Sequence, residues 1–218
     1  MLKVFRPIQT NRPGQKFGEN LACISSTGKI SSALSNGVCP AGTKLLYPQL
    51  GMKGHSGEDW GLYRGEPVYH SAEFTGKMKT EVDRDGGVGV DVVSLEVQEL
   101  LGGIKSHVKA RYWHLLTPVG WDGKEIHSGD LIGYGDNTGM SSGDHLHWAL
   151  KKCDKDGKNT EGWNGYMGAF DQAPYFENKF VVDVYDDLRA QVLTLQQQMD
   201  KLIYTFKKWY QGRDKKNG

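Results

Sequence analysis

Several features that mark other classes of protein are missing from this sequence. No run of 18 apolar residues exists, so no segment is long enough to cross a bilayer as a helix. The formal net charge is only +1, which argues against a chain built around nucleic acid. There is no C-x-x-C pair to indicate a cysteine metal site or redox centre, and no H-E-x-x-H motif. We therefore expect a soluble protein with no transmembrane segment and no nucleic-acid partner.

The start of the chain also lacks the features of a secretory signal. Residues Met1 to Pro7 have neither an apolar central region nor a small-residue cleavage site. We therefore predict no signal peptide, and expect the protein to stay in the cytoplasm until another route releases it.

Cysteine is scarce, and its count is odd at three. Cys23 and Cys39 flank a loop rich in serine and glycine, so they are able to form a disulfide in an oxidising compartment. Free thiols are the favoured interpretation, and the pairing stays open. Cys153 has no evident partner in the sequence.

Two histidines stand two residues apart in an alternating segment. His145 and His147 alternate with apolar residues between positions 142 and 150, which is typical of a β-strand. Since alternate residues of a strand share a face, both imidazoles should point to one side. Leu146 and Trp148 should then enter a core. Such a pair is as often solvated or hydrogen-bonded as metal-binding, so a metal site needs further ligands.

Further candidate ligands lie upstream of this strand. His55 and Asp59 are four residues apart in a glycine-rich stretch, residues 54–61, where a regular helix is disfavoured. A backbone of this kind bends closely enough to bring two ligands together. His114 lies in a third segment, Tyr112 to Leu115, whose surroundings predict another strand.

Three motifs, in this order and spacing, resemble the lysostaphin-type (LytM-like) zinc endopeptidases, which cut peptidoglycan peptides. The motifs are His55-x-Gly57-x-Asp59, Tyr112-x-His114-Leu115 and Gly143-x-His145-Leu146-His147. With linking glycine turns, the resemblance covers roughly residues 45 to 177. It implies that zinc is held by His55, Asp59 and His147. It also implies that His114 and His145 are the catalytic residues.

Some residues depart from the family pattern. Glu58 stands where the family usually has an apolar residue, and the charged stretch from Glu96 to Arg111 is an addition that is able to reshape the substrate groove. The remaining histidines match no family site and are expected at the surface. They are His70, His107 and His127.

The fold predicted for the middle of the chain is mainly β, with an antiparallel sheet. Short β-rich runs alternate with turn signals from Leu45 to Leu150. Residues 95–105 fit either a helical turn or a hairpin that turns at two glycines, and we favour the hairpin. We expect a peptidase domain with a zinc cleft at residues 45–177. A loop-rich lead-in at residues 1–44 would pack on that cleft.

Residues 178–218 have a different pattern, in which apolar residues alternate spacings of four and three. The apolar positions are Val181, Tyr185, Leu188, Val192, Leu195, Met199, Leu202, Phe206 and Trp209. A period of 3.5 predicts a C-terminal α-helix with a coiled-coil-like heptad pattern, and so a homo-oligomer. The alternative is one amphipathic helix folded back on its own domain. The basic end of the chain is a solvated tail or favours an anionic surface.

The implied ligand set is that of a catalytic zinc site. Three protein ligands leave a fourth position for water, whereas structural sites are closed by four. Because no H-E-x-x-H glutamate is present, His114 or His145 must act as the base. We assign water activation to His145, and oxyanion stabilisation or amine protonation to His114, with these two roles interchangeable.

Three functions are compatible with these features. The leading one is a zinc metalloendopeptidase that cleaves peptidoglycan stems or cross-bridges, encoded by a phage as an endolysin or a tail-associated protein. A phrase similar to Phe17-Gly18-Glu19-Asn20 occurs in family members from phages. A non-catalytic wall-binding protein assembled through its coiled coil is disfavoured by the intact ligand set. A zinc D-Ala-D-Ala carboxypeptidase, suggested by Trp113-His114, is disfavoured by the His-Leu-His motif and the motif order.

Overall fold

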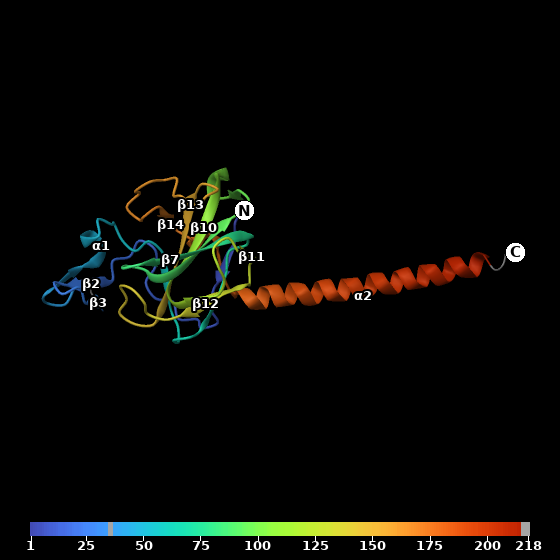
Figure 1. The fold of residues 1–218 in the computed structure, drawn as a ribbon, viewed down its shortest axis with the longest axis horizontal. Helices are drawn as coiled ribbons and strands as arrows, with labels where there is room; N and C mark the ends of the chain where they lie inside the picture. Colours follow the sequence, from blue (N-terminus) through green and yellow to red (C-terminus); the bar gives the residue numbers. More distant parts are fainter. Residues whose placement is uncertain (35–36, 215–218) are drawn as a thin grey trace. The chain divides into compact units, whose positions relative to one another are not determined.

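The computed structural model describes residues 1–34 and 37–214, and only the backbone of residues 204–205 and 207–214. The chain divides into two compact units, Met1–Val181 and Val182–Gly218. The first unit holds the described strands, and the second contains one long helix (Figure 1). All five predicted site residues lie in the first unit.

A ten-stranded sheet forms the centre of the described part of the first unit. Its strands are β5 Glu58–Gly61, β6 Pro67–Tyr69, β7 Gly76–Asp83, β8 Gly87–Ser94, β9 Gln98–Glu99, β10 Lys105–Pro118, β11 Glu125–Ile126, β12 Leu131–Gly135, β13 His145–Cys153 and β14 Ala169–Phe170. The order is β11-β7-β8-β10-β12-β6, while β13 pairs with β10, β5 and β14, and β9 pairs with β10. Every pair in this sheet is antiparallel, which confirms the predicted mainly β fold.

Alternation along β13 separates the core from the opposite face of the strand. Leu146, Trp148 and Leu150 are fully buried in the main hydrophobic core. His145 and His147 share the other face, as the period of two predicted. The neighbouring strands add Val90, Val92, Ala110 and Tyr112 to the core. Because a slip of one residue would exchange the two faces of β13, burial of these side chains fixes the register of the histidines.

The hairpin predicted between residues 95 and 105 is confirmed. Strand β9 pairs with the first residues of β10, Lys105 and Ser106. The turn contains a 3₁₀ helix, η1 Leu101–Gly103, in which Gly102 and Gly103 both have a φ of +73°. Glycine adopts this left-handed conformation without the steric cost of a Cβ atom, so the pair of glycines suits the turn.

Residues 1–45 contain short strands between their loops, and the role of residues 1–44 as a lead-in that packs on the cleft stays a prediction. The elements are β1 Val4–Arg6, β2 Ala22–Ser25, β3 Ile30–Ser32, β4 Thr43–Leu45 and, directly afterwards, the short helix α1 Leu46–Gln49. Strand β2 pairs with β3 and β4 in a small antiparallel sheet. Strands of three or four residues are too short to give a periodic signal in the sequence.

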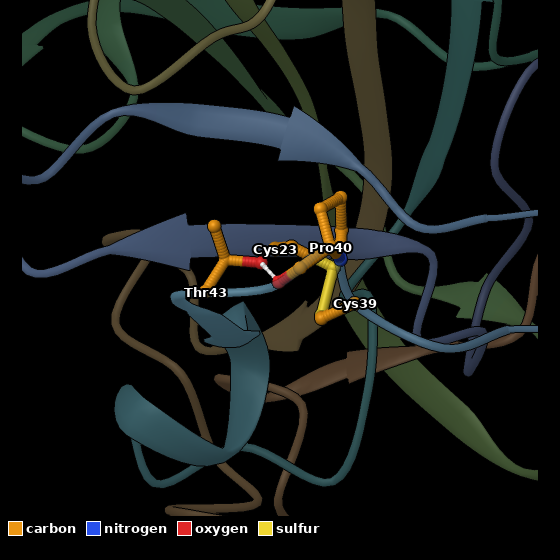
Figure 2. The surroundings of a disulfide bond; sticks show 4 residues. All are labelled: Cys23, Cys39, Pro40 and Thr43. Carbon is orange, nitrogen blue, oxygen red and sulfur yellow. Dashed lines mark hydrogen bonds between the residues drawn. A yellow bond between two sulfur atoms is a disulfide. The ribbon is translucent and has the colours of Figure 1, made fainter.

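A disulfide between Cys23 and Cys39 closes this small sheet, so the preference for free thiols is wrong (Figure 2). The two Cα atoms lie 5.7 Å apart, a separation that a disulfide spans. Thr43 Oγ1 donates a 2.7 Å hydrogen bond to the carbonyl of Pro40, which fixes the turn between Cys39 and β4. We call residues 22–49 the disulfide module. Cys153 is a buried free thiol.

The last strand joins the two ends of the first unit. A 3₁₀ helix, η2 Ala173–Tyr175, leads into β15 Phe176–Phe180, which pairs in parallel with β1. Phe180 and Val181 are both buried. The first unit therefore extends up to the start of the helix.

The C-terminal helix is confirmed as α2 Val181–Asp214. Six of its predicted heptad positions are exposed: Leu188, Val192, Leu195, Met199, Leu202 and Phe206. Their pairing with another chain stays a prediction, and the side chain of Trp209 lies outside the described residues. Among the residues that the structure describes, no helix is both long enough and apolar enough to span a membrane.

Candidate metal centre

The pairing of β5 with β13 builds the centre of the site. Asp59 stands opposite His147 in this antiparallel pair, and Gly61 stands opposite His145. Residues directly opposite each other on one face have Cβ atoms about 4.5–5.5 Å apart, so the register alone brings Asp59 to His147. His55 reaches the same point from the loop before β5. A Cβ at Gly57 would overlap the carbonyl oxygen of Trp148, so this loop passes β13 closely only because residue 57 is glycine.

The three predicted ligands converge with their polar atoms about 3 Å apart. His55 Nε2 lies 2.8 Å from His147 Nδ1 and 3.1 Å from Asp59 Oδ1. His147 Nδ1 lies 3.3 Å from the same carboxylate oxygen. Both imidazoles are more than nine-tenths buried. The Nδ1 of His55 donates to the carbonyl of Lys16, which directs Nε2 toward the other two ligand atoms.

Burial and charge give these residues the protonation states that metal ligands need. Burial lowers the pKa of His147 to about 3, although the nearby Asp59 acts in the opposite direction. Burial by itself would raise the pKa of Asp59, but His55 and His147 outweigh it and hold the pKa well below its usual range. Near neutral pH, Asp59 is therefore ionised and His147 is neutral, so each presents a lone pair.

His114 and His145 lie beside these ligands, with ring centroids 4.5 Å apart. His114 Nδ1 donates to the carbonyl of Thr138 at 2.7 Å, and His145 Nδ1 donates to the carbonyl of Gly143 at 2.8 Å. These bonds assign a proton to Nδ1 of each ring. Nε2 of His145 lies 3.6 Å from Asp59 Oδ1. Burial lowers the pKa of His114 to about 4, so this ring is neutral near pH 7.

The backbone of His114 is also unusual, because its φ is +65°. For an L-residue with a side chain, this left-handed conformation costs roughly 1–2 kcal/mol because of steric overlap. The pairing of β10 with β8 shifts its register between Tyr112 and Leu115, so His114 sits in a bulge. Its N–H donates to Gly86, and its carbonyl accepts from Asp136. Bulges re-aim side chains next to active sites, and this one turns the imidazole toward the ligands.

All five predicted residues line one cavity, whose volume is about 660 Å³. The rest of its wall was not predicted from the sequence. Gly86 and Gly89 leave room for the indole of Trp113 at the wall, since a Cβ at either would overlap that ring. Two methionines, Met140 and Met167, also line the cavity. A glycine opposite an aromatic residue is the only sequence signal that could have indicated this wall.

The three remaining histidines lie outside the cavity. His127 is exposed, as predicted, and His107 is partly buried and donates to the carbonyl of Ser94. The prediction of a surface position is wrong for His70, which is fully buried. Its two ring nitrogens meet the hydroxyl of Tyr112 at 3.1 Å and the carbonyl of Phe74 at 3.0 Å, and these partners make burial of the ring tolerable.

No family model matches the chain, and no curated protein matches it. Solved structures do match. The catalytic domain of lysostaphin, an antimicrobial peptidase from Staphylococcus simulans, is 22% identical, with a TM-score of 0.43 over 56% of this chain and 79% of that one. A catalytic domain of the prophage-encoded M23 protein EnpA from Enterococcus faecalis is 20% identical, with a TM-score of 0.38 over 51% of this chain and 79% of that one.

A zinc-containing peptidase from Vibrio cholerae is 19% identical, with a TM-score of 0.44 over 66% of this chain and 35% of that one. At identities below 25% and TM-scores below 0.5, these similarities establish no activity for this chain. The matched structures are nevertheless of the lysostaphin and M23 type, the class that the three sequence motifs resemble.

Proposed function

We propose that this protein is a zinc-dependent endopeptidase that hydrolyses peptide stems or cross-bridges of bacterial peptidoglycan. The observation that carries the proposal is the cluster of His55, Asp59 and His147, whose ligand atoms all lie within 4.8 Å of one another. His114 and His145 line the same cavity, each with its Nδ1 bonded to a backbone carbonyl. The substrate class is supported by the three motifs that resemble lysostaphin-type enzymes.

The ligand atoms fit zinc in kind and spacing. Two imidazole nitrogens and one carboxylate oxygen are ligands that catalytic zinc sites use. Zinc bonds of about 2.0–2.1 Å in a tetrahedron place ligand atoms about 3.3 Å apart. The observed separations of 2.8, 3.1 and 3.3 Å are close to that value. Residues with this geometry would hold the ion on three sides and leave the side toward the cavity open.

A zinc ion held there would lower the pKa of a water molecule toward ~7 and polarise a scissile carbonyl. His145 would accept the proton of the attacking water on Nε2, because its Nδ1 is already protonated and bonded to Gly143. His114 would stabilise the developing oxyanion or pass a proton to the leaving amine, and the two roles are interchangeable. The backbone carbonyls of Gly143 and Thr138 orient these rings before the substrate binds.

The test is hydrolysis of purified peptidoglycan sacculi, with the products identified by mass. We expect soluble fragments with new amino and carboxyl ends inside the peptide, loss of activity with a chelator, and recovery with added zinc. Removal of a terminal alanine alone would indicate a carboxypeptidase. Undiminished hydrolysis after exhaustive metal removal would refute the proposed mechanism, and binding to sacculi without any cleavage would indicate a wall-binding protein.

The proposal extends to the source of the enzyme, a phage-encoded endolysin or tail-associated protein. It is supported by the phrase Phe17-Gly18-Glu19-Asn20, which resembles family members from phages. Delivery would then follow release from a host cell or a phage particle.

We also propose that α2 pairs with α2 of a second copy. Support comes from the exposed heptad positions Leu188, Val192, Leu195, Met199 and Leu202, which recur at spacings of four and three. Apolar residues at this spacing bury each other in a coiled coil, whereas a helix that remains in water leaves all of them solvated.

The test is light scattering of the full chain at tens of micromolar. We expect two or three chains per particle, and a monomer after the joint changes Leu188→Glu and Leu195→Glu. Leu193→Glu is a matched control, because Leu193 is also exposed but lies off the heptad line. A monomeric wild-type protein would refute self-association.

A further inference from the structure

Two non-glycine residues in the described chain have a left-handed backbone, and both line the cavity. They are His114, with a φ of +65°, and Met167, with a φ of +53°. Such strain persists where the surrounding structure enforces it, and it tends to lie at functional sites. His114 already has a proposed role in the reaction. Met167 has none, and no sequence motif includes it.

Hydrogen bonds from nearby side chains hold Met167 in this conformation. Its carbonyl accepts from Lys151 Nζ at 2.9 Å and from Asn159 Nδ2 at 3.1 Å. Lys151 is 2% exposed and lies on β13, the strand that carries His147. Asn164 Oδ1 accepts from the N–H of Gly168, directly after Met167. Strand β13 therefore positions both Met167, through Lys151, and the predicted metal ligand His147.

The side chain of Met167 meets the disulfide module. Met167 and Met140, from two separate loops of the first unit, pack against a small apolar cluster that includes Leu46, Tyr47 and Met52. All five residues line the cavity that also contains the three predicted zinc ligands. One part of the cavity is thus apolar. Methionine side chains are flexible and polarisable, so a pocket walled by them adapts to different apolar groups.

The charges around this cavity disfavour an acidic substrate group. Four aspartates line it, namely Asp59, Asp83, Asp85 and Asp144. Among the described lining residues there is no lysine and no arginine. A carboxylate entering the apolar part of the cavity would lose water without gaining a lysine or arginine partner, which is unfavourable.

We propose that Met167 and Met140 form a subsite that binds an apolar side chain of the substrate beside the scissile bond and rejects an acidic one. The proposal rests on the peptidase function and adds the kind of residue that the enzyme selects. Met167 acts here as a specificity-determining residue, with Lys151 as the positioning residue behind it.

The test uses two synthetic peptides that differ only in one residue next to the cleaved bond, leucine in one and glutamate in the other. We expect wild type to prefer the leucine peptide in kcat/KM by about tenfold or more. In Met167→Gly the ratio of the two kcat/KM values should fall toward one. The fold should be kept, because glycine accepts the positive φ. Met167→Leu is the matched control, which keeps an apolar side chain and should keep the preference.

A second measurement separates this proposal from the proposed function. Calorimetry on zinc-free protein should show the leucine peptide binding about tenfold more tightly than the glutamate peptide, and a smaller ratio in Met167→Gly. Binding with this ratio, together with no hydrolysis of sacculi by the zinc-loaded protein, would support the subsite and refute the peptidase. Hydrolysis with equal rates for the two peptides, or a preference unchanged in Met167→Gly, would overturn the subsite and leave the peptidase standing.

Discussion

Gly57 lies between two predicted ligands, and its replacement by alanine should distort the metal centre. An added Cβ would overlap the carbonyl oxygen of Trp148 and lie 2.9 Å from Cε1 of His147. Carbon atoms pack at about 3.5–4.0 Å, so the loop or the strand has to move by roughly 0.5–1 Å. Overpacking of this kind costs about 1–3 kcal/mol of stability. Because His147 moves with its strand, we also expect zinc affinity to fall by about 10–100-fold, as it does when the support of a ligand is lost.

The assay combines urea unfolding with zinc titration against a coloured chelator. Gly61→Ala, at the end of the strand that follows Gly57, is the matched control. Its added Cβ would meet Arg12 Cβ at 3.4 Å, an ordinary contact, so we expect a change in stability within about 0.5 kcal/mol and unaltered zinc affinity. If Gly57→Ala has the same stability and zinc affinity as the wild type, the close approach of this loop to β13 does not shape the site.

Three further predictions follow from the site and the fold. His147→Ala should lose zinc and activity, whereas His145→Ala should keep zinc and lose about 10²–10⁴-fold in rate; the reverse pattern of metal content would show that the ligand is the other histidine. Replacing Cys23 and Cys39 by alanine should lower the free energy of unfolding by about 3 kcal/mol, from their separation of 16 residues, and an unchanged urea midpoint would contradict this. Burial lowers the pKa of His70 from 6.5 to about 4. Between these pH values His70 is therefore protonated in the unfolded chain but neutral in the folded chain. His70 should therefore contribute about 3 kcal/mol to the loss of stability between pH 6.5 and 4, and a flat unfolding profile would refute this.

The parts of the site that follow from local geometry could be predicted from the sequence. The alternation around His145 and His147 depends only on the two-residue period of a strand, and Leu146 and Trp148 indeed enter the core. The antiparallel sheet and the hairpin after β9 were likewise predictable, because they depend on short apolar runs and glycine turns. The convergence of His55 on this strand was expected from the family resemblance rather than from spacing.

The parts that depend on long-range pairing could not be predicted. Cys23 lies on β2 and Cys39 lies in the loop before β4, so their approach depends on the fold of this small sheet, and neither strand has a recognisable pattern. His70 is buried because Tyr112, 42 positions away, provides a hydroxyl for its ring. Met167 enters the cavity because Lys151 fixes its carbonyl, and lysine in a sequence normally indicates a solvated surface.

The pairing of β1 with β15 joins parts of the chain that leave the ribosome far apart in time. Arg6 and Asn178, which share a hydrogen bond across it, are 172 positions apart. At about 5–20 residues per second, synthesis of the intervening chain takes roughly 9–35 s. Throughout that interval Leu2 and Val4, buried in the finished protein, have no β15 to cover them. The nascent chain therefore exposes this apolar edge until β15 has been made, and an unpaired apolar edge of this kind favours aggregation.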